Sequence, residues 1–294
     1  MKIYLLDKKL VSEIRNHITL RTTQGVDTAR SADEPGCHVS PILALLTDKL
    51  LRGQRMEEML ESVATEVKLI DKFYKQAQTD STFLLDHKFS LVTPFCNGAE
   101  HKLRESIPFI WFLQRRLTAL KPDESAAQVR DEILANATQY KLEPGNPLVI
   151  TALAALYGHE QAQQIIRKDA GKVSENNPLS EAQIDLINIC LLPDLASTYS
   201  KRVWETSDKA PFDIFYTLLT TNPVLNAFAA SLGVSAHPVT TQVEGKDVIE
   251  CEYNMELTTD FFPAIANDGA QLAELVQKIT APAAPTSAQA QAAT

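Results

Sequence analysis

The chain has 294 residues, of which 45% are hydrophobic and 22% are charged. This composition is that of an ordinary globular protein, and it excludes wholesale disorder, collagen and a bare coiled coil. With 28 Lys and Arg against 37 Asp and Glu, the net charge is −9, which excludes a protein that binds nucleic acid indiscriminately over its whole surface.

The first residues and the cysteines bear on the cellular compartment. The apolar run Ile3–Leu6 stops at the charged residues Asp7–Lys9, so it predicts neither a signal peptide nor a membrane anchor. No other stretch approaches the roughly 20 uninterrupted apolar residues that a membrane-spanning helix needs. The four cysteines are too widely spaced for paired zinc ligands or a dense disulfide framework. We therefore expect a cytoplasmic protein with reduced thiols and no membrane contact.

The first half of the chain alternates strand and helix patterns. Ile3–Leu6 predicts a buried strand that ends at an acid, Asp7, and the polar residues 20–40 predict a loop. From Pro41 onward the apolar residues are spaced as on one face of a helix. Phe89–Thr93 is apolar and partly β-branched, and it predicts a second strand. Further helices are predicted at about 98–120, 124–140 and 147–168.

The second half continues the alternation. Ser180 is a suitable N-cap for a helix, and Ile214–Leu219 is the clearest buried strand. Val239–Val243 and Val248–Tyr253 flank a Glu-Gly-Lys-Asp turn and predict a β-hairpin. A final helix is predicted at about 268–279.

Strands that alternate with helices predict an α/β fold, and the excess of helix suggests an insertion. We predict a single domain over residues 1–280 that carries a largely helical insertion at about 41–80 and 120–170. Residues 281–294 are Ala, Pro, Gln, Ser and Thr, and they predict a disordered tail.

Several common catalytic motifs are missing from the sequence. There is no G-x-G-x-x-G, no phosphate-binding loop and no G-x-S-x-G. His159 begins a pattern like that of a zinc-protease helix, but Gln163 stands where the second His would be needed. Dinucleotide, phosphate-loop, serine-hydrolase and zinc-protease chemistry is therefore disfavoured.

Four polar residues follow predicted strands or begin the helices after them. Asp7 ends the first strand, and Glu100 lies early in the helix after the second. Asp185 lies in the first turns of a later helix, and Asn222 follows the clearest strand. Each alone has an ordinary explanation, as a helix cap or a solvated helix residue. Together they predict one cluster at the carboxyl edge of a parallel sheet, where open α/β folds bind ligands. Carboxylates there can hold Mg²⁺ or Mn²⁺, which activate water for attack on a phosphodiester.

This order of motifs resembles the PIN-like nuclease family. The shared features are the Leu-Leu-Asp strand end, an acid after the second strand, an Asp on a later helix and a Leu-Leu-Thr-Thr-Asn strand end. The resemblance implies a three-layer α/β sandwich with a mainly parallel central sheet, here with a largely helical insertion and a C-terminal β-hairpin. It also implies a Mg²⁺- or Mn²⁺-dependent nuclease that hydrolyses RNA, with Asp7, Glu100 and Asp185 as its catalytic, metal-binding acids.

Two positions depart from the family pattern. Lys8-Lys9 stands where the family usually has a small hydroxyl residue and Asn, and Asn222-Pro223 stands where a further Asp is often found. Both changes weaken the attraction for a cation. Glu181, four residues before Asp185 on the same helix face, would add a metal ligand, and Asn222 and Asn188 would support the site. The alternative is a catalytically inactive PIN-like domain that acts as a protein- or RNA-binding regulatory module.

Basic residues lie beside two of the acids. Lys8 and Lys9 follow the first acid, and Lys102 and Arg104 follow the second. At the rim of the crevice these side chains would bind RNA phosphates, whereas on a solvated helix face they would bind nothing. The helical insertion offers a surface for a protein partner or for a second copy of the chain.

Overall fold

The computed structural model describes residues 1–20, 26–52, 56–121, 123–169, 179–206, 213–243 and 246–280, with side chains at 48–52, 94–104, 243 and 246 not described. The chain divides into two compact units. The first comprises Met1–Arg104 and Ile184–Leu257, and the second comprises Glu105–Gln183 and Thr258–Thr294. The helical segments predicted at about 41–80 and 120–170 fall in different units. The single domain predicted over 1–280 stays a prediction.

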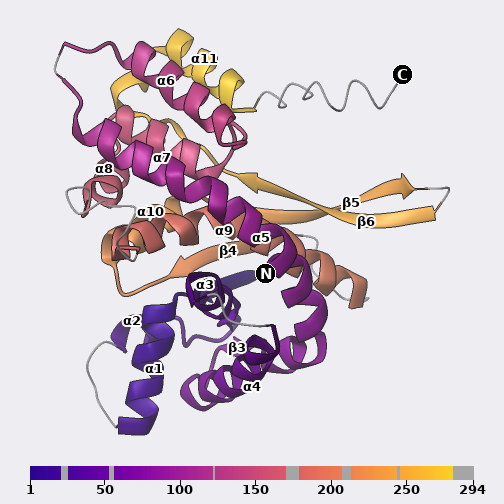
Figure 1. The fold of residues 1–294 in the computed structure, drawn as a ribbon. Coiled ribbons are helices and arrows are strands. Elements are labelled where there is room, and N and C mark those ends of the chain that lie inside the picture. Colours follow the sequence, from indigo (N-terminus) through magenta and orange to yellow (C-terminus); the bar gives the residue numbers. More distant parts are fainter. Residues whose placement is uncertain are drawn as a thin grey trace. The chain divides into compact units, whose positions relative to one another are not determined.

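The described part of the first unit contains a six-stranded mixed β-sheet with the order β3-β2-β1-β4-β5-β6 (Figure 1). Strand β1 pairs in parallel with β2 and β4, and β2 pairs in parallel with β3, whereas β4–β5 and β5–β6 are antiparallel. Leu6 of β1 lies opposite Leu219 of β4, so the carboxyl ends of these two strands are adjacent. The protein is therefore an α/β protein. The strands are β1 (Lys2–Leu6), β2 (Cys37–Ser40), β3 (Gln78–Thr79), β4 (Ile214–Leu219), β5 (Val234–Val243) and β6 (Lys246–Met255).

Helices make up most of the remaining described chain. Those within the first unit are α1 (Lys8–Leu20), α2 (Asp27–Arg30), α3 (Ile42–Arg52), α4 (Met56–Phe73) and α10 (Pro223–Ser231). Those within the second are α6 (Ala126–Gln139), α7 (Pro147–Leu156), α8 (Glu160–Arg167), η2 (Thr259–Phe261), η3 (Pro263–Ile265) and α11 (Gly269–Thr280). Two long helices, α5 (Ser81–Thr118) and α9 (Glu181–Thr206), contribute residues to both units. None of the helices in the described ranges combines the length and apolar character needed to cross a membrane.

Both faces of the sheet are covered by helices. On one face Leu6 and Leu219 pack in a buried cluster with apolar residues of α1 and α4. On the other face Tyr216 of β4 meets α9, where its ring lies edge-on to Tyr199 at 6.3 Å and its hydroxyl lies 2.5 Å from Ser200 Oγ. Because successive residues of a strand point to opposite faces, the apolar runs of β1 and β4 bury side chains on both sides.

Most of the predicted elements are confirmed. The strand Ile214–Leu219 has the predicted bounds, and the first strand begins one residue before the prediction. The hairpin is present, with longer strands than expected, and α11 falls where the final helix was expected. The tail predicted over 281–294 lies outside the described residues.

The predicted second strand, Phe89–Thr93, is wrong, because these residues lie inside α5. Phe89 is 63% exposed, while the neighbouring Leu91 and Val92 are both buried. On α5 the two buried residues lie on the face that packs inward, and Phe89 lies on the exposed side. The loop predicted over 20–40 is also wrong in part, since it contains α2 and β2. As a consequence, Glu100 lies within a helix and does not follow a strand.

Candidate functional site

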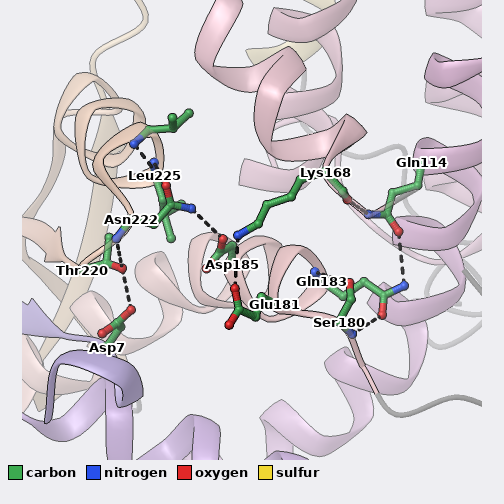
Figure 2. Close-up of polar contacts among 11 residues, drawn as sticks. Asp7, Gln114, Lys168, Ser180, Glu181, Gln183, Asp185, Thr220, Asn222 and Leu225 are labelled. Atoms are coloured by element: carbon green, nitrogen blue, oxygen red, sulfur yellow. Dashed lines mark hydrogen bonds and ion pairs between the residues drawn. The ribbon is translucent and has the colours of Figure 1, made fainter. Parts of the chain in front are cut away.

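Asp7 lies at the junction of β1 and α1 and is 5% exposed. Its backbone N–H donates to the carbonyl oxygen of Leu219 at 3.1 Å, which continues the pairing of β1 with β4. Its Oδ1 accepts the backbone N–H of Leu10 at 2.7 Å and so caps α1. Its Oδ2 accepts the hydroxyl of Thr220 at 2.5 Å (Figure 2). Asp7 is therefore both a helix cap and a polar group at the carboxyl edge of the sheet.

Asn222 connects Thr220 to Asp185. Its backbone N–H donates to Thr220 Oγ1 at 3.1 Å, and its Oδ1 accepts two backbone N–H groups in the first turn of α10 at 3.1 and 3.4 Å. Its Nδ2 donates to Oδ2 of Asp185, a residue of α9, at 2.9 Å (Figure 2). Asp7, Thr220, Asn222 and Asp185 thus form one hydrogen-bonded path, called here the Asp7–Asp185 network.

Burial and a neighbouring carboxylate raise the pKa values of two carboxyl groups here, Asp7 and Glu13. Burial is the main cause that raises the pKa of Asp7, and the Asp185 carboxylate raises it further, against the hydrogen bonds from Thr220 and Leu10 and the charge of Lys9, which lower it. On α1, the pKa of Glu13 is also raised, first by burial and then by the charge of Asp7. Buried acids with raised pKa values occur in sites that bind a cation or transfer a proton, and also in structural networks.

Asn188, predicted to support the site, and Glu181, predicted as a metal ligand, contact other parts of the chain. Asn188 is buried, and its Oδ1 accepts the hydroxyl of Thr47 on α3 at 2.9 Å. Glu181 belongs to the second unit, where its side chain is 68% exposed and lies 3.5 Å from the ammonium of Lys168 (Figure 2).

The remaining predicted residues lie on α1 and α5. Lys8 is half-buried and Lys9 is exposed in the first turn of α1. Glu100, Lys102 and Arg104 lie on α5, and their side chains are outside the described ones. Their predicted roles stay predictions.

The acids of the network fit a hydrated metal ion better than a closed cage of protein ligands. Among the described side chains, no group of three or more His, Cys, Asp or Glu could hold a metal ion. Mg²⁺, however, is often bound through one or two carboxylates and keeps several waters. Each oxygen of Asp7 that accepts one hydrogen bond retains a further lone pair for a cation. Asp7 and Asp185 are therefore residues that could hold such an ion.

The sequence interpretation missed two polar residues at the same sheet edge. Thr220 directly follows β4, as Asp7 directly follows β1, and this shared position was a usable signal. Asp80 directly follows β3, a strand of two residues that gives no hydrophobic pattern. With Ser40 at the end of β2, a polar residue ends or follows each of the four strands β3, β2, β1 and β4.

Comparison with known proteins identifies no relative. No family model matches the chain, and neither a curated protein nor a solved structure gives a significant match. A function for this chain therefore has to be proposed from its own sequence and geometry.

Proposed function

We propose that the chain is a PIN-like domain that hydrolyses RNA phosphodiesters with Mg²⁺ or Mn²⁺. The observation that carries the proposal is the Asp7–Asp185 network, which brings two buried, mutually repelling carboxylates from β1 and α9 into one path. Divalent cations are attracted to such a pair because they offset its charge.

The position of the network also supports the proposal. Asp7 and Thr220 follow two adjacent parallel strands, and the crevice outside the carboxyl ends of parallel strands is where open α/β sheets bind ligands. A three-layer sandwich with a mainly parallel central sheet is the finer fold that we propose. Helices on both sheet faces are consistent with it.

The residues of the chain take distinct roles in this proposal. Asp7 and Asp185 hold the ion, and Glu100 completes its ligands. When bound, the ion supplies Lewis-acid chemistry for the hydrolysis of a phosphodiester. Thr220 and Asn222 orient the two carboxylates through their hydrogen bonds. The substrate phosphates are bound by cationic side chains at the rim, namely Lys8, Lys9, Lys102 and Arg104.

The second candidate is a catalytically inactive PIN-like module in the cytoplasm that binds a protein or RNA, or pairs with a second copy through its helical segments. One observation favours it. Both oxygens of Asp7 already accept hydrogen bonds from the chain, at 2.7 and 2.5 Å, and Asp185 accepts the Asn222 amide. A network that is satisfied in this way can stabilise the fold without an ion.

Mn²⁺ titration of the full chain separates the two candidates. Thermal stability and cleavage of a labelled RNA are measured for the wild type, Asp7→Asn, Asp185→Asn and a control, Asp213→Asn, which neutralises an exposed acid just before β4. If the chain is a nuclease, the wild type and the control are stabilised by Mn²⁺ and cleave RNA. The two network variants are not stabilised by Mn²⁺ and do not cleave RNA. Mn²⁺ stabilisation without cleavage favours the inactive module. No response of the wild type to Mn²⁺ and no cleavage refutes the nuclease.

A further inference from the structure

A second polar surface of the first unit lies at the opposite end of α1 from Asp7. It is a hollow of about 490 Å³, within the size range of small-molecule sites. His17 and Ile18 of α1 form one wall, and Lys72 and Phe73 of α4 form another. Arg30 at the end of α2 closes a third side. We call this surface the basic hollow.

The cations of the basic hollow are only weakly compensated. Lys72 and Lys75 are exposed, and within the described part of the chain no carboxylate forms an ion pair with either ammonium. Arg30 has the carboxylate of Asp27 at 3.9 Å, but that acid is 93% exposed, so the attraction is weak. On its other side, Nη2 of Arg30 lies 3.4 Å from Nε2 of His17.

Asp33 is the one carboxylate among the described residues that line the hollow, and it is already engaged. Oδ1 of Asp33 accepts the backbone N–H groups of Lys75, Gln76 and Ala77 at 2.9, 2.7 and 2.9 Å. Partial burial alone would raise the pKa of Asp33, but these three hydrogen bonds together lower it below its ordinary value. Asp33 fixes the loop through these hydrogen bonds, and its charge also offsets part of the charge of Lys75. The described residues that line the hollow include three cations, Arg30, Lys72 and Lys75, and one carboxylate, so positive charge is in excess among them.

The two apolar side chains that line the hollow, Phe73 and Ile18, are held in place. The ring of Phe73 is half-buried and lies edge-on to the rings of His17 and Tyr74, at 5.8 and 5.0 Å between centroids. Ile18 and Phe73 also pack against the buried cluster that α1 and α4 share. A ligand in the hollow therefore meets both cations and apolar side chains that are packed in place. Phosphate groups suit such cations, and rings suit such surfaces.

We propose that the basic hollow binds an organic phosphate that carries a ring, of the chemical class of a nucleoside monophosphate. Lys72, Lys75 and Arg30 hold the phosphate, and Phe73 and Ile18 contact the ring. The same chemistry is offered by a free nucleotide and by one nucleotide unit of an RNA. The hollow is distinct from the Asp7–Asp185 network, because His17 is ten residues from Asp7 along α1, a rise of about 15 Å.

Binding measured without divalent metal tests the proposal independently of any nuclease activity. In EDTA at roughly physiological salt, the full chain is titrated with inorganic phosphate and AMP by calorimetry, and with a short labelled single-stranded RNA by fluorescence anisotropy. The variant is Lys72→Gln. The matched control is Lys68→Gln, which removes an exposed ammonium one turn earlier on α4, outside the hollow.

We expect Lys72→Gln to weaken binding of AMP or of the RNA about ten-fold, which corresponds to one charge-assisted hydrogen bond. Lys68→Gln should change it less than about two-fold if its charge acts only through solvent. Binding of AMP identifies a free nucleotide as a ligand, whereas binding of the RNA alone identifies a nucleotide within a strand. The proposal is overturned if neither probe binds at about 1 mM, if both variants weaken binding equally, or if an oligoglutamate peptide competes as well as AMP.

Discussion

Asp80→Asn tests whether a buried acid at the end of β3 makes the fold sensitive to pH. Asp80 is 9% exposed, and its Oδ2 accepts the hydroxyl of Tyr199 at 3.0 Å. Its Oδ1 is buried with no hydrogen-bond partner among the described residues. Burial is the main cause that raises the pKa of Asp80 from 3.8 to about 7, and the Asp71 carboxylate adds to it, against hydrogen bonds from Ser40 and Tyr199. Asn has the same shape, keeps an acceptor for Tyr199 and carries no charge.

The sign of the effect follows from where the proton is held. The unfolded chain releases this proton near pH 4, but the folded protein holds it until about pH 7. Between these values the folded state binds more protons, so stability falls as pH rises. At about 1.4 kcal/mol per pKa unit, the rise to about 7 corresponds to about 4 kcal/mol that is present below pH 4 and lost above pH 7. The Asn variant titrates in neither state and escapes this loss.

The measurement is the free energy of unfolding in urea at about pH 5 and about pH 8.5 for both proteins. We expect Asp80→Asn to exceed the wild type by several kcal/mol at the higher pH and by much less at the lower one. Asp86→Asn, an exposed position on α5, should match the wild type at both. An Asp80→Asn advantage of the same size at both pH values would show that Asp80 titrates near its ordinary pKa, and would refute the reasoning.

Three further substitutions test the local geometry by urea or thermal unfolding. Thr220→Val removes the hydroxyl that donates to Asp7 and should cost about 1–3 kcal/mol; Thr221→Val, whose buried hydroxyl has no described partner, should cost nothing, and equal losses would contradict the assignment. Asn222→Ala removes the cap of α10 and should cost about 1–2 kcal/mol, with Asn222→Ser recovering part of it. Gly233→Ala places a Cβ at φ +54° and 3.0 Å from a neighbouring side chain, so it should cost about 1–2 kcal/mol, and an unchanged Tm would be unexpected.

The sequence predicts the strands that carry long apolar runs and fails on the short ones. β1 and β4 are buried on both faces, so nearly every residue is apolar and the strands are visible. β2 has four residues and β3 has two, and their pairing depends on neighbours that no local pattern contains. Conversely, Phe89–Thr93 has strand composition but lies in α5, because tertiary packing overrides weak propensity.

The residues of the candidate site also divide into those that the sequence pattern predicts and those that it does not. Asp7 could be predicted because it directly follows a strand with a clear pattern, and Asn222 because it lies three residues after another. Asp185 could be predicted because it lies near the start of a helix with a clear cap. Spacing alone placed Asn188 on the face of Asp185, but that face turns toward α3, where Thr47 donates to it. Asp80 could not be predicted from the sequence, because the two-residue strand before it has no recognisable pattern. The role of a residue that depends on a short strand or on a contact between helices cannot be predicted from the local sequence pattern.

Asp7→Asn separates the structural role of Asp7 from a role in binding. Asn caps helices about as well as Asp, and its amide can serve both Leu10 and Thr220, since the threonine hydroxyl can accept instead of donate. Burial and the charge of Asp185 raise the pKa of the Asp7 carboxyl group. The folded protein is therefore less stable once Asp7 has lost its proton, and its stability falls as the pH rises through the titration of Asp7.

In EDTA at about pH 8 we therefore expect Asp7→Asn to be at least as stable as the wild type by urea unfolding. With Mn²⁺ the order should reverse, because only the wild type gains stability from binding. A carboxylate that destabilises the metal-free fold, at a position where an amide would cap equally well, has the properties of a ligand for a cation. If Asp7→Asn is less stable in EDTA and Mn²⁺ changes neither protein, Asp7 serves the fold alone.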